Sequence, residues 1–103
     1  MANDSRIERI KGELHEVYDP EIPVNIYDLG LIYSIDIDEE NKATIVMTLT
    51  APGCPVADMI VQQVYDAAMN VDGVDDCFVD LTFDPPWDKS MMSEEAKLEL
   101  GFF

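Results

Sequence analysis

The sequence has 103 residues, 48% of them hydrophobic, so it is long enough for a single domain over residues 1–103 and too apolar for a disordered chain. Its 22 acidic side chains against 6 basic ones give a formal net charge of −16, which repels phosphate backbones and anionic lipids and argues against nucleic-acid and membrane-surface roles. Neither a membrane-spanning apolar run nor a signal-peptide pattern is present, so we expect a cytoplasmic protein with free thiols.

The first predicted element is a helix that begins near Ser5 and carries an apolar stripe as far as Tyr18, where Asp19-Pro20 ends it. Residues 21–28 form an apolar loop that we expect to pack onto the domain, and Gly30 marks a turn. Residues 31–37 and 44–49 alternate between apolar and polar side chains, which predicts two strands joined as a hairpin. The apolar faces of these strands are Leu31, Tyr33, Ile35 and Ile37 in the first and Ile45, Met47 and Leu49 in the second.

A second helix is predicted from Val56 to Ala68, with Met59 on its apolar stripe. A third strand follows over residues 77–83, and a short helix over residues 96–100 is capped by Ser93 and closed by Gly101. The strand–helix–strand crossover predicts that the second and third strands are parallel. The predicted fold is a small α+β domain with a mixed three-stranded sheet and helices packed on it.

Cys54 is the most prominent candidate for a functional residue. It lies between Pro52-Gly53 and Pro55, at the turn from the second strand into the second helix. Backbone N–H groups and the helix dipole at such a turn favour a thiolate, which can attack an electrophile or bind a soft metal. The alternative is a half-buried turn cysteine that acts as a small hydrophobic side chain.

Four motifs in the same order resemble those of the SufT/PaaD-like family of iron–sulfur assembly domains. They are the run from Asp19-Pro20-Glu21 through Asp28-Leu29-Gly30-Leu31 to Tyr33, the turn Thr48-Leu49-Thr50-Ala51-Pro52-Gly53-Cys54-Pro55, the segment Leu81-Thr82-Phe83-Asp84-Pro85-Pro86-Trp87, and Met92-Ser93-Glu94. The resemblance covers nearly the whole chain. One departure is Ala51, where family members with two threonines in the turn have the second.

The resemblance implies a non-enzymatic helper that carries iron–sulfur clusters, or brings the assembly machinery to apo-protein clients. In PaaD-like members the client is an oxygenase of phenylacetate breakdown. Cys54 is then the metal contact, since thiolates are the usual ligands of these clusters. One cysteine cannot complete a ligand set, so a transient cluster would be shared across a homodimer, or with a client or glutathione.

Asp19 and Glu21 are supporting candidates, because their carboxylates can bind iron, accept a thiol proton or dock a client if their loop lies beside Cys54. Asp19 can equally bond backbone N–H groups of its own loop. Thr50 can donate its hydroxyl to a sulfur or simply end its strand. Asp28 and Trp87 are candidates for partner docking, with a turn cap and a plug at the end of the sheet as the respective alternatives.

The remaining cysteine and the single histidine are expected to be structural. Cys77 is predicted to lie in the core, and His15 on the solvated surface off the apolar stripe. Two further hypotheses stay open. The chain can be a metal-free adaptor that holds clients through residues 19–28 and the Trp87 region, or a cysteine enzyme, which is disfavoured because no histidine base lies near Cys54 in the sequence. The segment after Trp87 can also exchange between protomers.

Overall fold

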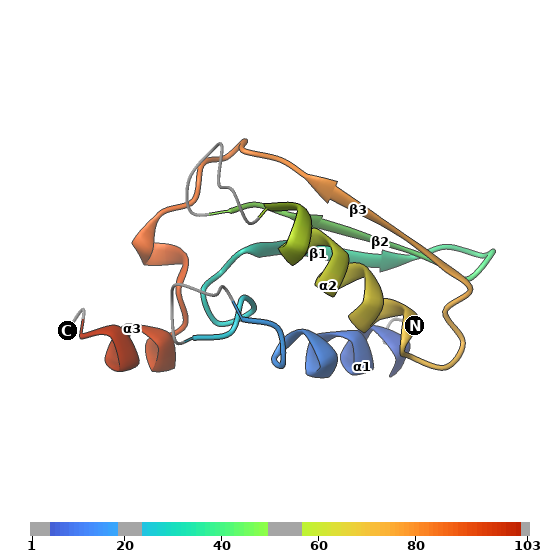
Figure 1. Ribbon diagram of the computed structural model, residues 1–103, viewed down its shortest axis with the longest axis horizontal. Helices are drawn as coiled ribbons and strands as arrows, with labels where there is room; N and C mark the ends of the chain where they lie inside the picture. Colours follow the sequence, from blue (N-terminus) through green and yellow to red (C-terminus); the bar gives the residue numbers. More distant parts are fainter. Residues whose placement is uncertain (1–4, 19–23, 50–56, 102–103) are drawn as a thin grey trace.

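The computed structural model describes residues 5–18, 24–49 and 57–101 (Figure 1). The elements follow the predicted order and form a small α+β domain. They are α1 (Ser5–Leu14), β1 (Ile32–Ile37), β2 (Lys42–Met47), α2 (Ala57–Met69), β3 (Asp76–Leu81), the short 3-10 helix η1 (Lys89–Met91) and α3 (Glu94–Leu100). The 3-10 helix η1 was not predicted from the sequence.

The three strands form one sheet in the order β1-β2-β3. β1 and β2 are antiparallel, with Ile35 opposite Ile45, and β2 and β3 are parallel, with Ile45 opposite Val79. The hairpin and the parallel crossover are therefore both confirmed. The peptide bond between Asp84 and Pro85, beyond the end of β3, is cis.

The core lies between one face of the sheet and the two longer helices. Ala43, Ile45 and Met47 of β2 point to this face and are fully buried, together with Ile10 of α1 and Ile60 of α2. Figure 1 shows α1 and α2 against the sheet, with α3 set apart from them near the C-terminus. No described helix covers the opposite face, where Phe78 is 52% exposed.

The predicted apolar face of the first strand is wrong at Tyr33, whereas Leu31 is fully buried in the core as predicted. β1 carries a β-bulge between Ile32 and Ser34, and Ile32 pairs with Met47. Ile32 packs against the core, and Tyr33 is the extra residue of the bulge. Alternation from Leu31 cannot anticipate this shift, because Leu31, Ile32 and Tyr33 are all apolar and the pattern does not show which of them is the extra residue.

The predicted end of the first helix is also wrong, since α1 ends at Leu14 instead of reaching Tyr18. The N–H groups of Glu16 and Val17 donate to carbonyls three residues back instead of four, which closes the last turn. The carbonyl of Val17 then accepts the N–H of Ile26 at 2.8 Å. Tyr18 forms an antiparallel bridge with Asn25 and is 49% exposed. A tertiary backbone contact thus takes over where the apolar stripe would have continued the helix.

Two smaller corrections concern α2 and β3. Ile60, Val64, Ala67 and Ala68 are buried as predicted, whereas Met59 is 43% exposed. β3 ends at Leu81, so Phe83 lies beyond the strand and is 38% exposed. Residue Val56 of the predicted second helix lies outside the described residues.

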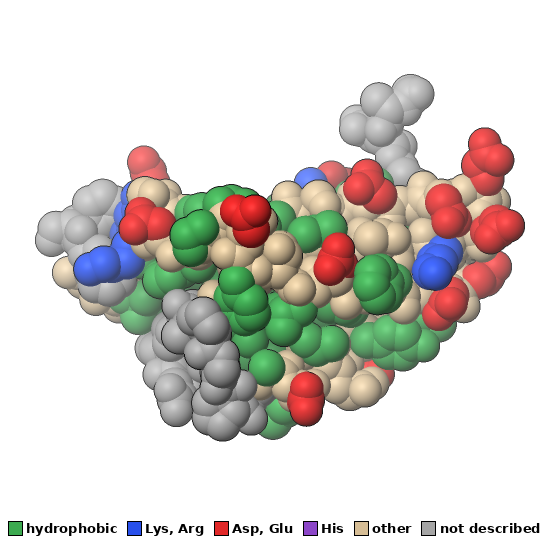
Figure 2. All heavy atoms as spheres, turned by 90° about the horizontal axis from the view of Figure 1, so that it is seen from above, with side chains coloured by type: hydrophobic (Ala, Val, Ile, Leu, Met, Phe, Trp, Pro, Cys, Tyr) green, Lys and Arg blue, Asp and Glu red, His purple; other side chains and the backbone are tan. Residues whose placement is uncertain are grey.

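Polar contacts close the end of the sheet at the β1–β2 turn, called the hairpin end below. A guanidinium nitrogen of Arg6 donates to the Asn41 side chain at 2.7 Å and to the carbonyl of Gly73 at 2.8 Å. Asn41 and Gly73 both have positive φ, which their turns require. Figure 2 shows acidic side chains gathered around one basic side chain at the right-hand end of the molecule, and hydrophobic side chains across the middle of the face.

The last helix has both predicted end signals. The Ser93 hydroxyl oxygen accepts the N–H of Ala96 at 3.1 Å, and Gly101 adopts the left-handed conformation that closes the helix. α3 is anchored by Ala96, which is 1% exposed, and by Met92 just before it, which is 5% exposed.

Candidate functional site

Four of the predicted site residues, Cys54, Asp19, Glu21 and Thr50, lie outside the described residues. The segments that contain them join described parts of the chain. Residues 19–23 connect Tyr18 to Val24, and residues 50–56 connect Leu49 to the start of α2 at Ala57. The described part of the site therefore consists of Asp28, Trp87 and their surroundings.

The described parts of the four motifs meet at one end of the sheet, where β1 begins and β2 and β3 finish. We call this the motif end. Backbone hydrogen bonds from Thr48 to the carbonyl of Leu31 and from Thr82 to the carbonyl of Met47, both 2.8 Å, join the strand ends. Because β2 and β3 are parallel, the second and third motifs follow these strands at the same end of the sheet.

Asp28 is fixed by contacts on three sides. Its carboxylate accepts the side-chain amide of Asn25 at 2.9 Å, and its N–H donates to the Asn25 side-chain oxygen at 2.8 Å. Its carbonyl accepts the N–H of Ser93 at 2.8 Å, which ties the first motif to the fourth. Asp28 thus lies in a turn whose capping side chain is Asn25, not Asp28 as the turn-cap alternative had it, and the Asp28 side chain is still 21% exposed. The Asn-x-x-Asp spacing is the sequence signal that could have identified Asn25 as its partner.

Trp87 joins the third motif to the first. Its indole N–H donates to the carbonyl of Leu29 at 2.7 Å, and its ring packs against the core. Nearby, the Tyr33 hydroxyl donates to the carbonyl of Pro85 at 2.7 Å. Trp87 therefore plugs the end of the sheet, as the structural alternative predicted, and any docking role has to use the exposed part of its ring.

Gly30 allows two backbone segments, its own and that of Met91, to approach each other closely at the motif end. Its φ is +82°, and a Cβ at this position would clash with the carbonyl oxygen of Met91 and lie 2.8 Å from the carbonyl carbon of the same residue. The glycine of the first motif is therefore needed for the backbone to pass η1.

His15 is more engaged than predicted for a solvated residue. Its ring lies 4.6 Å from the ring of Tyr27, and its Nδ1 lies 2.7 Å from the carbonyl oxygen of Lys11. Since a carbonyl only accepts, Nδ1 carries the proton, and Nε2 faces the Asp28 carboxylate at 3.8 Å. His15 is 41% exposed at its side chain and belongs to the packing around Asp28.

Cys77 is a core residue, as predicted. It is 7% exposed on the helix-covered face of β3, beside Ala43. Burial, helped by the negative charge of Asp76, raises the pKa of the Cys77 thiol to about 11. The thiol is therefore protonated at neutral pH and is a poor metal ligand.

A cleft of about 180 Å³ opens beside Asp28, between α3 and a part of the chain made of Tyr18 and residues 24–28. It is lined by three carboxylates and by Tyr18, Val24, Asn25 and Ala96; the carboxylates are those of Asp28, Glu95 and Glu99. Among residues 5–18, 24–49 and 57–101, no group of three or more histidine, cysteine or acidic side chains is arranged to hold a metal ion. In the same part of the chain, no helix is long and apolar enough to cross a membrane.

Comparison with known proteins places these features in a wider context. A family model described as iron–sulfur cluster assembly protein matches residues 7–81. The chain is 57% identical, over 92% of its length and 90% of the relative, to a protein of Porphyromonas gingivalis named Fe-S protein maturation auxiliary factor. It is 41% identical, over 82% of its length and 97% of the relative, to the Fe-S protein maturation auxiliary factor SufT of Staphylococcus aureus.

A solved structure has the same fold. The crystal structure of a domain of unknown function, DUF59, from Bacillus anthracis matches with a TM-score of 0.88 and 40% sequence identity, over 96% of this chain and 94% of that one. Together with the family match, this likeness confirms the resemblance that the four motifs indicated.

Proposed function

This chain belongs to the iron–sulfur cluster assembly protein family, and from that premise we propose that it acts as a non-enzymatic auxiliary factor in the maturation of iron–sulfur proteins. The support is the family match over residues 7–81 and the similarity to proteins named as maturation auxiliary factors. The partners in this role are the assembly machinery and apo-protein clients.

Within this role, Cys54 carries or hands over a cluster or iron. The observation that supports this assignment most strongly is the state of the other cysteine, since Cys77 is buried and its pKa is raised to about 11. Only one of the two thiols of the chain is thus left to form a metal bond at neutral pH. A single thiolate under-ligates a cluster, so a second copy or a client supplies further ligands and the cluster is transient.

Asp19, Glu21 and Thr50 act beside Cys54, and Asp28 and Trp87 mark the surface where clients dock. The support for their shared location is the convergence of the four motifs at the motif end, where Leu29 accepts from Trp87 and Asp28 accepts from Ser93. Residues 19–23 and 50–56 both connect to described residues near this end.

A metal-free adaptor is the second candidate. It is favoured by the exposed apolar side chains of Tyr18 and Met59, each next to one of the two segments that bear the candidate residues. Such side chains can contact a client without any metal bond.

Anaerobic reconstitution with ferrous iron and sulfide separates these two roles. Wild type is compared with Cys54→Ser and with Cys77→Ser as the matched control, and visible absorbance, bound iron and solution mass are read together. For a carrier, wild type and Cys77→Ser gain the cluster chromophore and shift to a dimer, whereas Cys54→Ser does neither. Iron uptake by none of the three proteins would overturn the carrier role and leave the adaptor.

A further inference from the structure

A groove between the two longer helices has no role in the function proposed above. It has a volume of about 440 Å³ and lies between the end of α1 and the C-terminal half of α2. Its rim has three carboxylates and two amides, and its floor is apolar; these residues are Glu13, Glu16, Asp66, Gln63, Asn70, Val17 and Ala67.

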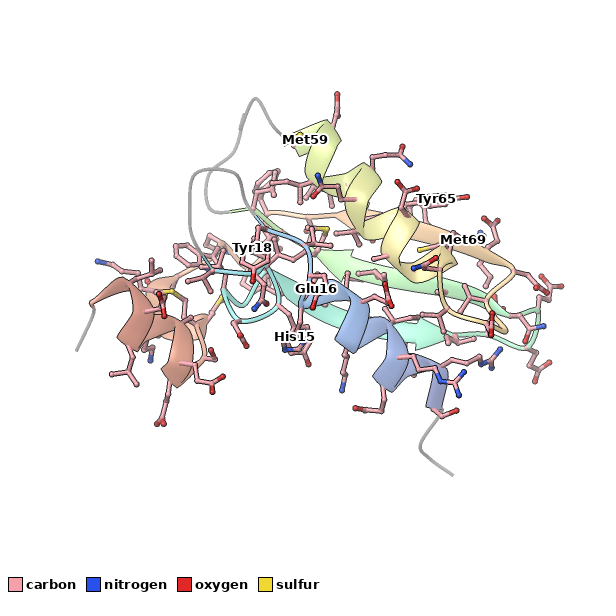
Figure 3. All side chains as sticks on the ribbon, turned by 60° about the horizontal axis from the view of Figure 1, so that its bottom comes forward. His15, Glu16, Tyr18, Met59, Tyr65 and Met69 are labelled. Atoms are coloured by element: carbon pink, nitrogen blue, oxygen red, sulfur yellow. The ribbon has the colours of Figure 1, made fainter. Side chains whose placement is uncertain are left out.

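The apolar floor of the groove is sparse but well defined. Val17 is 6% exposed and Ala67 is 7% exposed, so both belong to the core and reach its surface here. Val17 is in place because α1 ends early and its last turn tightens around this residue. Figure 3 shows Glu16 on the side of α1 that faces α2, and His15 on the other side.

Two carboxylates of the rim accept hydrogen bonds from side-chain amides. Glu13 accepts the side-chain amide of Asn70 at 3.3 Å, and Asp66 accepts that of Gln62 at 3.0 Å. Amides carry no charge to balance that of a carboxylate, and among the described residues no lysine or arginine lines the groove. An apolar floor under an uncompensated acidic rim fits a long basic side chain, whose aliphatic part lies on the floor while its charge reaches the rim.

The side of α2 that lines this groove continues beyond it toward the start of the helix. Met59, Gln63 and Asn70 recur at spacings that place them along the same side, and Met59 is 43% exposed. In Figure 3, Met59 lies at the N-terminal end of α2, which begins three residues after Cys54 in the sequence. A segment bound along this side of α2 would reach Met59, an exposed apolar side chain near the N-terminal end of the helix.

We propose that the groove between α1 and α2 binds a basic, partly apolar segment of a partner protein. The net charge of −16 repels nucleic acids and anionic membranes, and it also disfavours a second copy of this chain in the groove. A protein segment that alternates arginine or lysine with leucine-like side chains meets both the rim and the floor. That this partner is a client or an assembly protein rests on the proposed function, whereas the groove itself does not.

The test uses an amidated peptide of repeated Leu-Arg-Ala-Arg units and the full chain. The groove variant Glu13→Gln/Glu16→Gln/Asp66→Asn is compared with Asp36→Asn/Glu39→Gln/Glu40→Gln near the hairpin end, which removes the same number of charges from exposed or partly exposed positions. We expect the groove variant to weaken binding by about tenfold or more, because charge-assisted contacts are lost, and the control variant to weaken it only slightly.

A charge swap keeps the test decisive. The single variant Glu16→Lys should bind the arginine peptide more weakly and bind better than wild type to the peptide with glutamate in place of arginine. Equal weakening by the groove and control variants would show general charge attraction only and would overturn the proposal. Both variants retain Cys54, so reconstitution of the groove variant reports on the carrier role independently of peptide binding.

Discussion

The two ends of the sheet are closed in different ways. At the hairpin end, one long side chain, Arg6, bridges two turns through exposed or partly exposed polar groups. At the motif end, Trp87 donates to the carbonyl of the fully buried Leu29, and the backbone at Gly30 passes directly against that of Met91. A long side chain near the surface can adjust to a change around it, whereas the close backbone approach at Gly30 leaves no room for a Cβ. The described parts of the four motifs meet at the end that has this close approach.

The largest effect is expected at Gly30. Gly30→Ala introduces a Cβ that clashes with the Met91 backbone at a positive φ, so the free energy of unfolding should fall by about 3 kcal/mol or more. Gly12→Ala is the matched control, because nothing lies within 4 Å of its Cβ position and it is inside α1. Alanine should stabilise that site by about 0.5–1 kcal/mol. Urea unfolding followed by circular dichroism measures both, and similar effects at the two glycines would show that the close approach of Gly30 to Met91 is not needed for stability.

Trp87→Phe is the next most disruptive change. It keeps a ring in place but leaves the carbonyl of Leu29, a fully buried residue, without its indole donor. We expect a loss of about 1–3 kcal/mol in the free energy of unfolding. Tyr33→Phe is the control, since its hydroxyl donates to Pro85 in an exposed setting and its loss should cost about 0.5 kcal/mol. A larger loss for Tyr33→Phe than for Trp87→Phe would contradict the importance of the buried carbonyl.

Cys77, near the hairpin end, is expected to make the free energy of unfolding depend on pH in the alkaline range. The pKa of its thiol is raised from 9.0 to about 11 in the fold, so its stabilising contribution is complete below pH 9 and is lost as the pH rises toward 11. The free energy of unfolding should fall over this window by about 2 kcal/mol more in wild type than in Cys77→Val. Denaturant titrations at several pH values measure the difference. Parallel pH curves for the two proteins would show that the thiol is not buried in solution.

The smallest effects concern one aspartate at each end. Backbone N–H groups of Lys42 and Glu40 lower the pKa of Asp38 in the hairpin turn, and the Ser90 side chain and N–H lower the pKa of Asp88 before η1. A lowered pKa means that each carboxylate stabilises the fold above its ordinary value of 3.8 and loses this contribution as the pH falls. Carboxyl NMR titration should give both values below 3.8. A normal pKa at either residue would show that its turn is open in solution.

The order of elements was predictable because each one carries its own local pattern. β2 alternates strictly, and α2 buries Ile60, Val64 and Ala67 at helical spacing. The errors arose where a distant contact overrides a local pattern. The apolar stripe of α1 runs on to Tyr18, but the bond from Ile26 to Val17 ends the helix, and the bulge at Tyr33 leaves no trace in the polarity of the strand.

The candidate site shows the same division. Cys77 was predictable as core because it falls in the apolar phase of β3, and Asp28 as a turn residue because it precedes Gly30. The contact of Trp87 with Leu29 was not predictable, since it joins residues 58 positions apart and depends on how the loops fold over the sheet. The groove between α1 and α2 was not predicted for a related reason. Its lining residues come from two separate segments of the sequence, and neither segment alone indicates a groove.

Trp87 is the only tryptophan of the chain, and its indole is bonded at the motif end. The tryptophan emission of the protein therefore originates from a single site, and it reports on the end where the four motifs meet. An iron–sulfur chromophore accepted nearby would absorb that emission and quench it. If the proposed carrier role holds, this tryptophan is a built-in optical probe that would report cluster binding and release in real time without an attached dye.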